Sequence, residues 1–177
     1  YIETHPSFFD KIKNEFSEQV LVESGLFYLD EKKKIYVERF RGRLIFPINN
    51  ISGQPIALGG RIIEKSDYLA KYINSPETNF FKKGSNLYNL DNARKLSNKL
   101  DHIYLVEGYM DVVGLSKNGI ENAVANLGTS LTDKQILTLN QFFDDIIICF
   151  DGDESGYKAA LRAAENSIKE LKPEKQI

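Results

Sequence analysis

The stretch HIYLVEGYMDVVGL, at residues 102–115, decides the fold class of this chain. It joins an apolar strand at 102–106 to a short amphipathic helix, on which we expect Met110, Val113 and Leu115 to face inward. The same order of strand, turn and helix recurs further along the chain, with strands expected at 122–126 and 146–150 and helices at 132–143 and 154–171. Repeated β-α-β order predicts a parallel sheet with helices on both faces.

Two local patterns refine this prediction. The unbroken apolar run at 146–150 is typical of a parallel strand that is buried on both faces, which places Cys149 in the core. Thr132 followed three residues later by Gln135 is the pattern of a capping box, so the helix after the second strand is expected to begin there.

The chain before residue 96 has a different texture. Phe8, Ile12 and Phe16 recur at four-residue spacing and predict a helix over 7–19. Segments rich in β-branched and aromatic residues then predict strands at 35–40, 43–48 and 55–63, followed by an irregular stretch at 64–90 and a short helix capped by Asp91. We therefore expect an α+β subdomain over 1–98 and a parallel α/β domain over 99–177 that is incomplete at its C-terminal end.

Composition bounds the function. The 177 residues include one cysteine, which excludes a disulfide within the chain, and two histidines, too few to complete a four-ligand zinc site of Cys and His with it. No apolar run is long enough to cross a membrane, and the absence of an initial methionine is expected of a fragment of a longer cytosolic protein. The net charge of −2 by itself argues against nucleic-acid binding.

The distribution of charge reverses that inference. Residues 31–95 carry 13 basic and 6 acidic side chains, a net charge of +7, whereas residues 101–155 carry 2 basic and 10 acidic ones, a net charge of −8. A basic block followed by an acidic block indicates a polyanionic partner beside a site that collects carboxylates.

Four of those carboxylates follow two of the expected strands: Glu107, Asp111, Asp151 and Asp153. Ligand sites of open α/β sheets lie at the carboxyl ends of the strands, so we expect the four side chains to converge there. Carboxylates held together repel one another unless a cation neutralises them, and oxygen-only ligands favour Mg²⁺ or Mn²⁺. Such sites serve phosphoryl or nucleotidyl transfer.

Other interpretations of the segment DGDESG, at 151–156, are weaker. An EF-hand loop would need a glutamate where the chain has Arg162. A phosphatase of the haloacid dehalogenase type and a receiver domain both place an aspartate at a strand end, and solvated turn residues would suit Asp151 and Asp153 taken alone. None of these accounts for Glu107-Gly108 on a second strand.

Several segments resemble one family in the same order along the chain. LVEGYMDVVGL (105–115), AVANLGTSLT (123–132) and FDGDESGYKAA (150–160) closely resemble the Toprim core of bacterial DnaG-type primases. Upstream, the resemblance to the preceding subdomain of that family is carried by RFRGRLIFPI (39–48), IALGGRII (56–63), KYINSPET (71–78) and FFKKGSNLYNL (80–90). It covers residues 20–171 and omits the family's zinc module, helicase-interacting region and final acidic motif.

The resemblance implies roles for individual residues. Glu107 would be the catalytic carboxylate, as metal ligand or general base, and Asp111, Asp151 and Asp153 would complete the Mg²⁺ or Mn²⁺ site. The residues that would line the template and nucleotide groove are Arg43, Arg61, Lys71 and Lys83, with Lys82 as an alternative to Lys83 and with Asn74 and Ser75 orienting the groove. The Lys32-Lys33-Lys34 run matches no motif and is expected to be a solvated turn.

The function implied is synthesis of short RNA primers on single-stranded DNA from ribonucleoside triphosphates. A replicative helicase would be bound through a C-terminal region absent from this chain, and the location would be the bacterial cytoplasm, at the replisome. A non-catalytic DNA-binding Toprim protein and a nuclease or topoisomerase with the same core remain as rivals. The segments NSPET and FFKKG argue against the first, and no tyrosine motif supports a topoisomerase.

Overall fold

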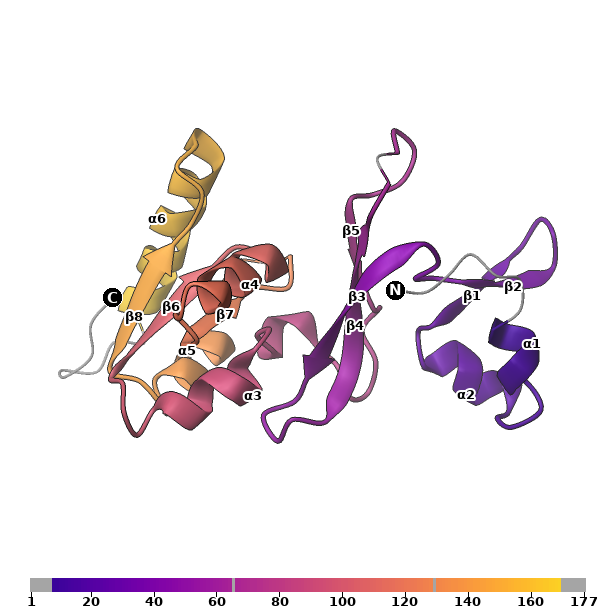
Figure 1. The fold of residues 1–177 in the computed structure, drawn as a ribbon, viewed down its shortest axis with the longest axis horizontal. Coiled ribbons are helices and arrows are strands. Elements are labelled where there is room, and N and C mark those ends of the chain that lie inside the picture. Colours follow the sequence, from indigo (N-terminus) through magenta and orange to yellow (C-terminus); the bar gives the residue numbers. More distant parts are fainter. Residues whose placement is uncertain (1–7, 65, 129, 170–177) are drawn as a thin grey trace. The chain divides into compact units, whose positions relative to one another are not determined.

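The computed structural model describes residues 8–64, 66–128 and 130–169 (Figure 1). The chain forms two compact units. The N-terminal unit comprises residues 1–47 and 57–81, and the α/β unit comprises residues 48–56 and 82–177. Segment 82–98, which the sequence suggested would belong with the first part of the chain, thus packs with the α/β unit.

The N-terminal unit begins with two short helices, α1 (Phe8–Ile12) and α2 (Glu18–Glu23), followed by an antiparallel hairpin of β1 (Phe27–Asp30) and β2 (Ile35–Glu38). The single helix expected over 7–19 is wrong within the described residues: it ends at Ile12, and the hydroxyl of Ser17 caps α2 by accepting from the Val20 N–H at 3.4 Å. Phe16 therefore lies between helices, half exposed, instead of extending an apolar stripe.

A second sheet of three strands follows, in the order β3 (Arg43–Asn49), β4 (Pro55–Ile62) and β5 (Tyr72–Asn74). β4 and β5 are antiparallel, and the strands expected near 43–48 and 55–63 are confirmed. Gly60 allows close packing here, because a Cβ on it would lie 2.8 Å from the Phe40 ring and 3.0 Å from the Cδ of Arg43.

The α/β unit confirms the predicted parallel sheet. Its strands are β6 (His102–Val106), β7 (Ala123–Ala125) and β8 (Asp145–Cys149), in the order β7-β6-β8, with both pairs parallel. The connecting helices are α4 (Tyr109–Lys117) and α5 (Asp133–Leu139), and α6 (Glu154–Ile168) follows β8. The capping box at Thr132 and Gln135 is confirmed, whereas residues 170 and 171 of the expected last helix lie outside the described residues.

Three short elements precede the sheet: the 3-10 turns η1 (Lys83–Ser85) and η2 (Arg94–Leu96), and α3 (Leu90–Ala93) between them. The cap of α3 is Asn89, with φ of 68°, and not Asp91. Asp91 is instead buried in the first turn, where its Oδ2 accepts from the side-chain amide of Asn49 at 2.9 Å.

Alternation along the parallel strands divides the core of the α/β unit into two layers. On one face, Ile103, Leu105, Val124 and Ile146 pack with residues of α3, α5 and α6. On the other face, Val106, Ala123 and Ala125 pack with Val112 of α4. Of the residues expected to face inward from α4, Leu115 packs against this layer, whereas Met110 and Val113 are exposed and that part of the expectation is wrong. Tyr109 and Val112 are buried instead.

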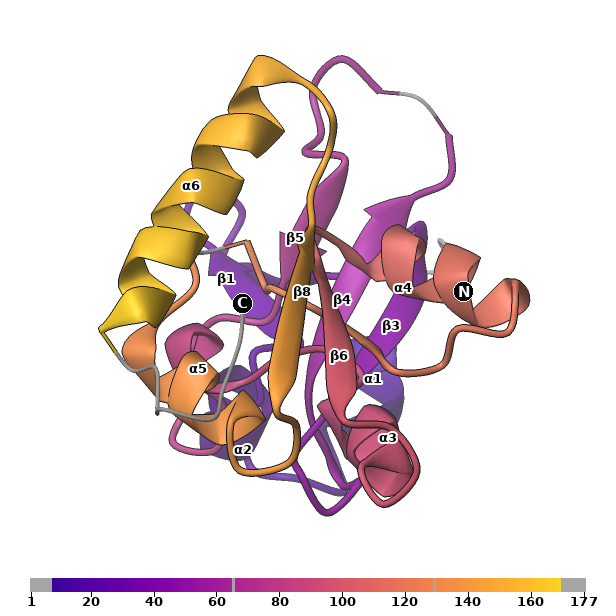
Figure 2. The same ribbon diagram turned by 90° about the vertical axis from the view of Figure 1, so that its left-hand side faces the viewer.

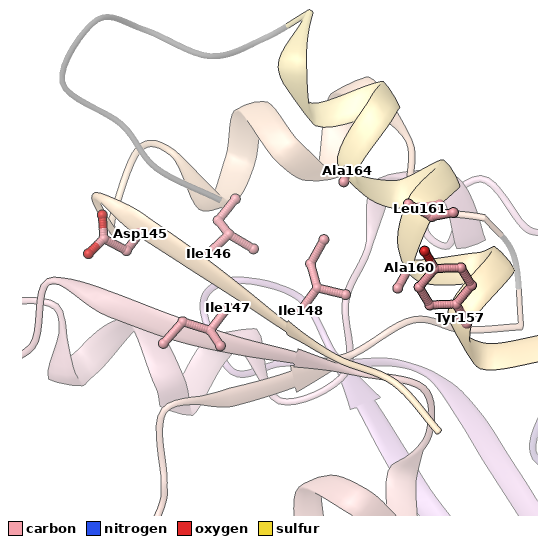
Figure 3. Close-up of a pocket in the computed structure, with 8 residues that line it drawn as sticks. All are labelled: Asp145, Ile146, Ile147, Ile148, Tyr157, Ala160, Leu161 and Ala164. Atoms are coloured by element: carbon pink, nitrogen blue, oxygen red, sulfur yellow. The ribbon is translucent and has the colours of Figure 1, made fainter. Parts of the chain in front are cut away.

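The outer edge of β8 is open within the described part of the chain. Figures 1 and 2 show α6 lying alongside this strand, and Figure 3 shows Ile146 and Ile148 on the side of β8 that faces the helix. Between them is an apolar groove of about 490 Å³. The helix α4 packs against β7 and leaves the opposite face of β8 uncovered within the described residues. Ile147 and Cys149 are therefore exposed, and the expectation that Cys149 is a core residue is wrong.

None of the helices in residues 8–64, 66–128 and 130–169 combines the length and the apolar character that a membrane crossing requires.

Candidate functional site at the carboxyl edge of the sheet

Glu107 and Asp151 meet at the carboxyl edge of the parallel sheet. β6 and β8 are neighbours in register, with Val106 opposite Cys149, so the residues that follow them leave the sheet side by side. The backbone N–H of Asp151 donates to Oε1 of Glu107 at 3.1 Å. The Glu107 carboxylate, which lies 44 positions earlier in the sequence, is thereby held against the backbone of Asp151.

Asp111 and Asp153 are held by the helices that begin at this edge. The N–H of Gly108 donates to Oδ2 of Asp111 at 2.9 Å, and the N–H of Gly156 donates to Oδ1 of Asp153 at 2.7 Å. Negative side chains are favoured at helix N-termini, where unpaired N–H groups give a partial positive charge. Each bond occupies one carboxylate oxygen, and all four acidic side chains are exposed to solvent.

The donor set suits a hard divalent cation, because all four side chains offer carboxylate oxygens. No group of three His, Cys, Asp or Glu side chains in the described residues is arranged closely enough to hold a metal ion. The expected convergence of the four carboxylates is therefore wrong for the described structure: Glu107 and Asp151 follow neighbouring strands, and Asp111 and Asp153 lie in the first turn or at the cap of the helices that come next. The carboxylate oxygens of these residues are ligands that suit Mg²⁺, and the four side chains are exposed along one edge of the sheet.

Gly156 supports this edge and was not among the predicted site residues. A Cβ at this position would overlap the backbone carbonyl of Asp151, so only glycine allows the 151–156 turn to close as it does. The signal in the sequence is the spacing of Asp153 and Gly156, since an N-cap side chain bonds the third residue of its helix.

Arg43, the first of the predicted basic residues, is buried in the N-terminal unit. Its Nη1 donates to the carbonyl of Ala70 at 2.9 Å and, at longer range, to those of Lys71 and Gly60 at 3.4 and 3.5 Å. Burial lowers the pKa of this guanidinium from its ordinary value. Arg43 therefore joins β3 to β4 and to the segment that leads into β5.

Arg61 and Lys71 flank one aromatic ring. Arg61 lies opposite Tyr72 across β4 and β5, with its Cζ 5.8 Å from the centre of the tyrosine ring, and the Nζ of Lys71 lies 5.7 Å from the same centre. Lys71 and Tyr72 are exposed and Arg61 is half-buried. Two cations and one aromatic ring thus lie together on this small sheet.

Asn74 and Ser75 end β5. Asn74 pairs with Gly59 in the sheet register and is half-buried. Ser75 is buried; its Oγ accepts from the Leu58 N–H at 3.0 Å, and its own N–H donates to the Leu58 carbonyl at 2.8 Å. Ser75 thus fixes the end of this strand.

A cleft of about 770 Å³ in the N-terminal unit contains arginines that the sequence did not single out. Arg39 and Arg41 line it together with Arg43, beside the apolar side chains of Ile63 and Leu69. Arg39 also donates through Nε to the carbonyl of Gly25 at 2.9 Å. The signal that could have identified the cleft is the segment RFRGR, at 39–43, which carries three arginines in five residues.

Lys82 and Lys83 lie at η1 in the α/β unit, with Lys82 exposed and Lys83 half-buried. The Lys32-Lys33-Lys34 run is an exposed turn, as predicted, in which Oδ1 of Asp30 accepts from two backbone N–H groups.

Comparison with known proteins gives two family matches. Residues 2–94 match the family described as DNA primase catalytic core, N-terminal domain, and residues 101–177 match the Toprim domain. A DNA primase of Neisseria meningitidis is 45% identical over 157 residues, which are 89% of this chain and 26% of that protein.

Two solved structures resemble the fold. A DNA primase domain from Pseudomonas aeruginosa is 40% identical with a TM-score of 0.88, over 98% of this chain and 54% of that one. A DnaG primase catalytic domain bound to single-stranded DNA is 36% identical with a TM-score of 0.83, over 94% and 52%. The chain thus spans about half the length of these solved chains and about a quarter of the curated relative.

Proposed function

This chain belongs to the bacterial DnaG-type DNA primase family, and from that premise we propose that it is the central part of a primase that synthesises short RNA primers on single-stranded DNA. The reaction would be nucleotidyl transfer between ribonucleoside triphosphates. The observation that supports the proposal is the hydrogen bond from the Asp151 N–H to Glu107, which joins acidic residues that follow two neighbouring strands at the carboxyl edge of the sheet.

Glu107, Asp151, Asp111 and Asp153 are the residues that would hold Mg²⁺ or Mn²⁺. When bound, such a cation stabilises charge on the attacking and leaving oxygens of the transfer. Glu107 itself is exposed and has one oxygen outside the bond to Asp151, so it can accept the proton of a 3′-hydroxyl. The caps made by Asp111 and Asp153 keep their carboxylates oriented without burying them.

The basic residues would bind the polyanions. Arg61 and Lys71, which lie close together around Tyr72, can contact phosphates of the template or of a triphosphate. Arg41, in the cleft of the N-terminal unit, is an additional candidate for template contacts. The helicase contact would belong to the part of the relatives that this chain does not cover, and the setting would be the bacterial cytoplasm at the replisome.

The test is primer synthesis by the complete protein on single-stranded DNA. Glu107→Gln and Asp151→Asn should each lower the rate about 100-fold or more, as removal of a group that stabilises transition-state charge does. Glu121→Gln is the matched control, since Glu121 is exposed in the same unit and lies outside the site. Undiminished synthesis by both site variants would refute the proposal, and nicking of supercoiled DNA without primer synthesis would favour the nuclease rival.

A further inference from the structure

One side chain of α5 makes contacts that its role as a helix cap does not explain. In a capping box, the residue at the third helical position bonds the backbone of the cap residue. Gln135 does so: its Oε1 accepts from the Thr132 N–H at 3.0 Å. Its Nε2 points elsewhere and donates to the carbonyls of Lys83 and Asn86, at 3.1 and 2.8 Å, about 50 residues earlier in the chain.

Thr132 contacts the same loop. Its hydroxyl donates to the carbonyl of Gly84 at 2.6 Å and accepts from the Gln135 N–H at 3.2 Å. Three carbonyls between residues 83 and 86 are therefore held by two side chains at the start of α5. Gln135 is fully buried and both its amide N and O are used, which avoids the cost of enclosing an unpaired amide.

The loop is fixed at the same edge of the sheet as the acidic residues. Tyr88 forms an antiparallel bridge with Ala125, the last residue of β7, through N–H···O bonds of 2.9 and 3.2 Å. The next residue, Asn126, donates its N–H to the carbonyl of Val106, directly before Glu107. Because α5 runs back from the carboxyl end of β7, its start lies at this edge as well.

We propose that Gln135 and Thr132 are positioning residues, which hold the 82–86 loop so that Lys82 and Lys83 present their ammonium groups to phosphates beside the carboxylate edge. This inference rests on the proposed function, in which these lysines bind nucleic acid or triphosphate. A lysine has a long flexible side chain, so the place of its backbone largely sets where its charge can reach. The clamp adds no contact with the substrate and acts through the loop.

The experiment measures binding of a single-stranded DNA oligonucleotide by the complete protein at several salt concentrations. On single-stranded DNA, the logarithm of the binding constant falls as the logarithm of the salt concentration rises, and each phosphate contact adds about 0.7 to the magnitude of that slope. A lower slope here means a smaller magnitude. Gln135→Glu keeps the size of the side chain and removes both donated bonds to the loop, so we expect it to reduce the magnitude of the slope by up to two contacts, about 1.4. Lys83→Ala should reduce it by about 0.7, a variant that lacks both Lys82 and Lys83 should reduce it as much as Gln135→Glu does, and adding Gln135→Glu to that variant should reduce it no further.

Two controls separate positioning from general damage. Gln141→Glu makes the same chemical change at an exposed position just after α5 and should leave the slope unchanged. If Gln135→Glu unfolds the protein, Thr132→Val and Thr132→Ser give the same test: the valine lacks the bond to Gly84 and should lower the slope, and the serine should restore it.

Different results are expected if the positioning role of Gln135 and Thr132 fails and if phosphate binding by the lysines fails. If Lys83→Ala lowers the slope while Gln135→Glu or Thr132→Val leaves it unchanged, the positioning role is overturned and the lysine contact stands. If a variant that lacks both Lys82 and Lys83 has the slope of the unmodified protein, the lysine contact is refuted, and the positioning role falls with it.

Discussion

The acidic residues at the sheet edge and Arg43 in the N-terminal unit are held by opposite groups of the backbone. Asp111, Asp153 and Glu107 accept N–H groups of turns and helix starts, and they stay exposed. Arg43 donates to carbonyls and is buried by doing so. A carboxylate has two oxygens and can cap a helix with one while offering the other, whereas the Arg43 guanidinium is enclosed by the strands it joins.

This difference predicts which substitutions lower the free energy of unfolding and which lower only metal binding, DNA binding or the rate of primer synthesis. At the acidic edge, we expect the stability of the fold to depend on Gly156 and on the backbone N–H groups that the carboxylates accept, more than on the negative charge of the carboxylates. Among the basic residues, burial separates Arg43, which stabilises the sheet, from Lys71, which faces solvent.

The largest effect is expected for Gly156→Ala. The added Cβ would overlap the Asp151 carbonyl, and relief of that overlap must displace the turn that carries Asp151 and Asp153. We expect a loss of about 3 kcal/mol in the free energy of unfolding, together with loss of activity. Denaturant unfolding measures the first. Gly114→Ala is the control, because nothing lies within 4 Å of a Cβ there and an alanine in α4 should be neutral or stabilising.

The second prediction concerns Arg43→Met. It leaves the carbonyl of Ala70 and its neighbours without their buried donor, so unfolding free energy should fall by about 2 kcal/mol. Arg43→Lys should recover only part of this, since one ammonium does not reproduce the planar fork. Thermal unfolding and DNA binding are measured together. A large loss of DNA affinity with unchanged stability would show instead that Arg43 contacts the template directly.

A smaller effect is expected at Asp153, where cap and ligand can be separated. Asp153→Ala removes the acceptor for the Gly156 N–H and should cost about 1 kcal/mol, while Asp153→Asn keeps an acceptor and should cost little. Both should weaken Mg²⁺ or Mn²⁺ binding, which calorimetric titration measures. Equal metal affinity in Asp153→Asn and the unmodified protein would remove Asp153 from the ligand set.

The smallest effect is expected at Lys33. This lysine lies in the exposed turn after Asp30, in a run that matches no motif, so Lys33→Ala should change neither stability nor the salt dependence of DNA binding. Lys83→Ala is its counterpart and should lower the salt slope by about 0.7. If Lys33→Ala and Lys83→Ala gave the same slope, the distinction between Lys83 as a phosphate contact and Lys33 as a solvated side chain would be wrong.

Local sequence determined much of this molecule. The parallel strands, the start of α5 at Thr132 and the acidic residues at the strand ends were all predictable, because alternation and capping depend on residues within a few positions of each other. Parallel pairing predicted that Glu107 and Asp151 lie at the same edge of the sheet, whereas their approach depends on β6 and β8 being neighbours, which the structure decided.

Tertiary structure decided what depends on distant neighbours. Cys149 is exposed because no described helix covers that face of β8, although its segment has the composition of a core strand. Arg43 is buried because carbonyls 17 to 28 residues away surround it, and Gln135 holds a loop about 50 residues earlier in the chain. Burial and long-range hydrogen bonds depend on how distant elements pack together. The sequence pattern of a single segment does not predict which of its faces another element will cover.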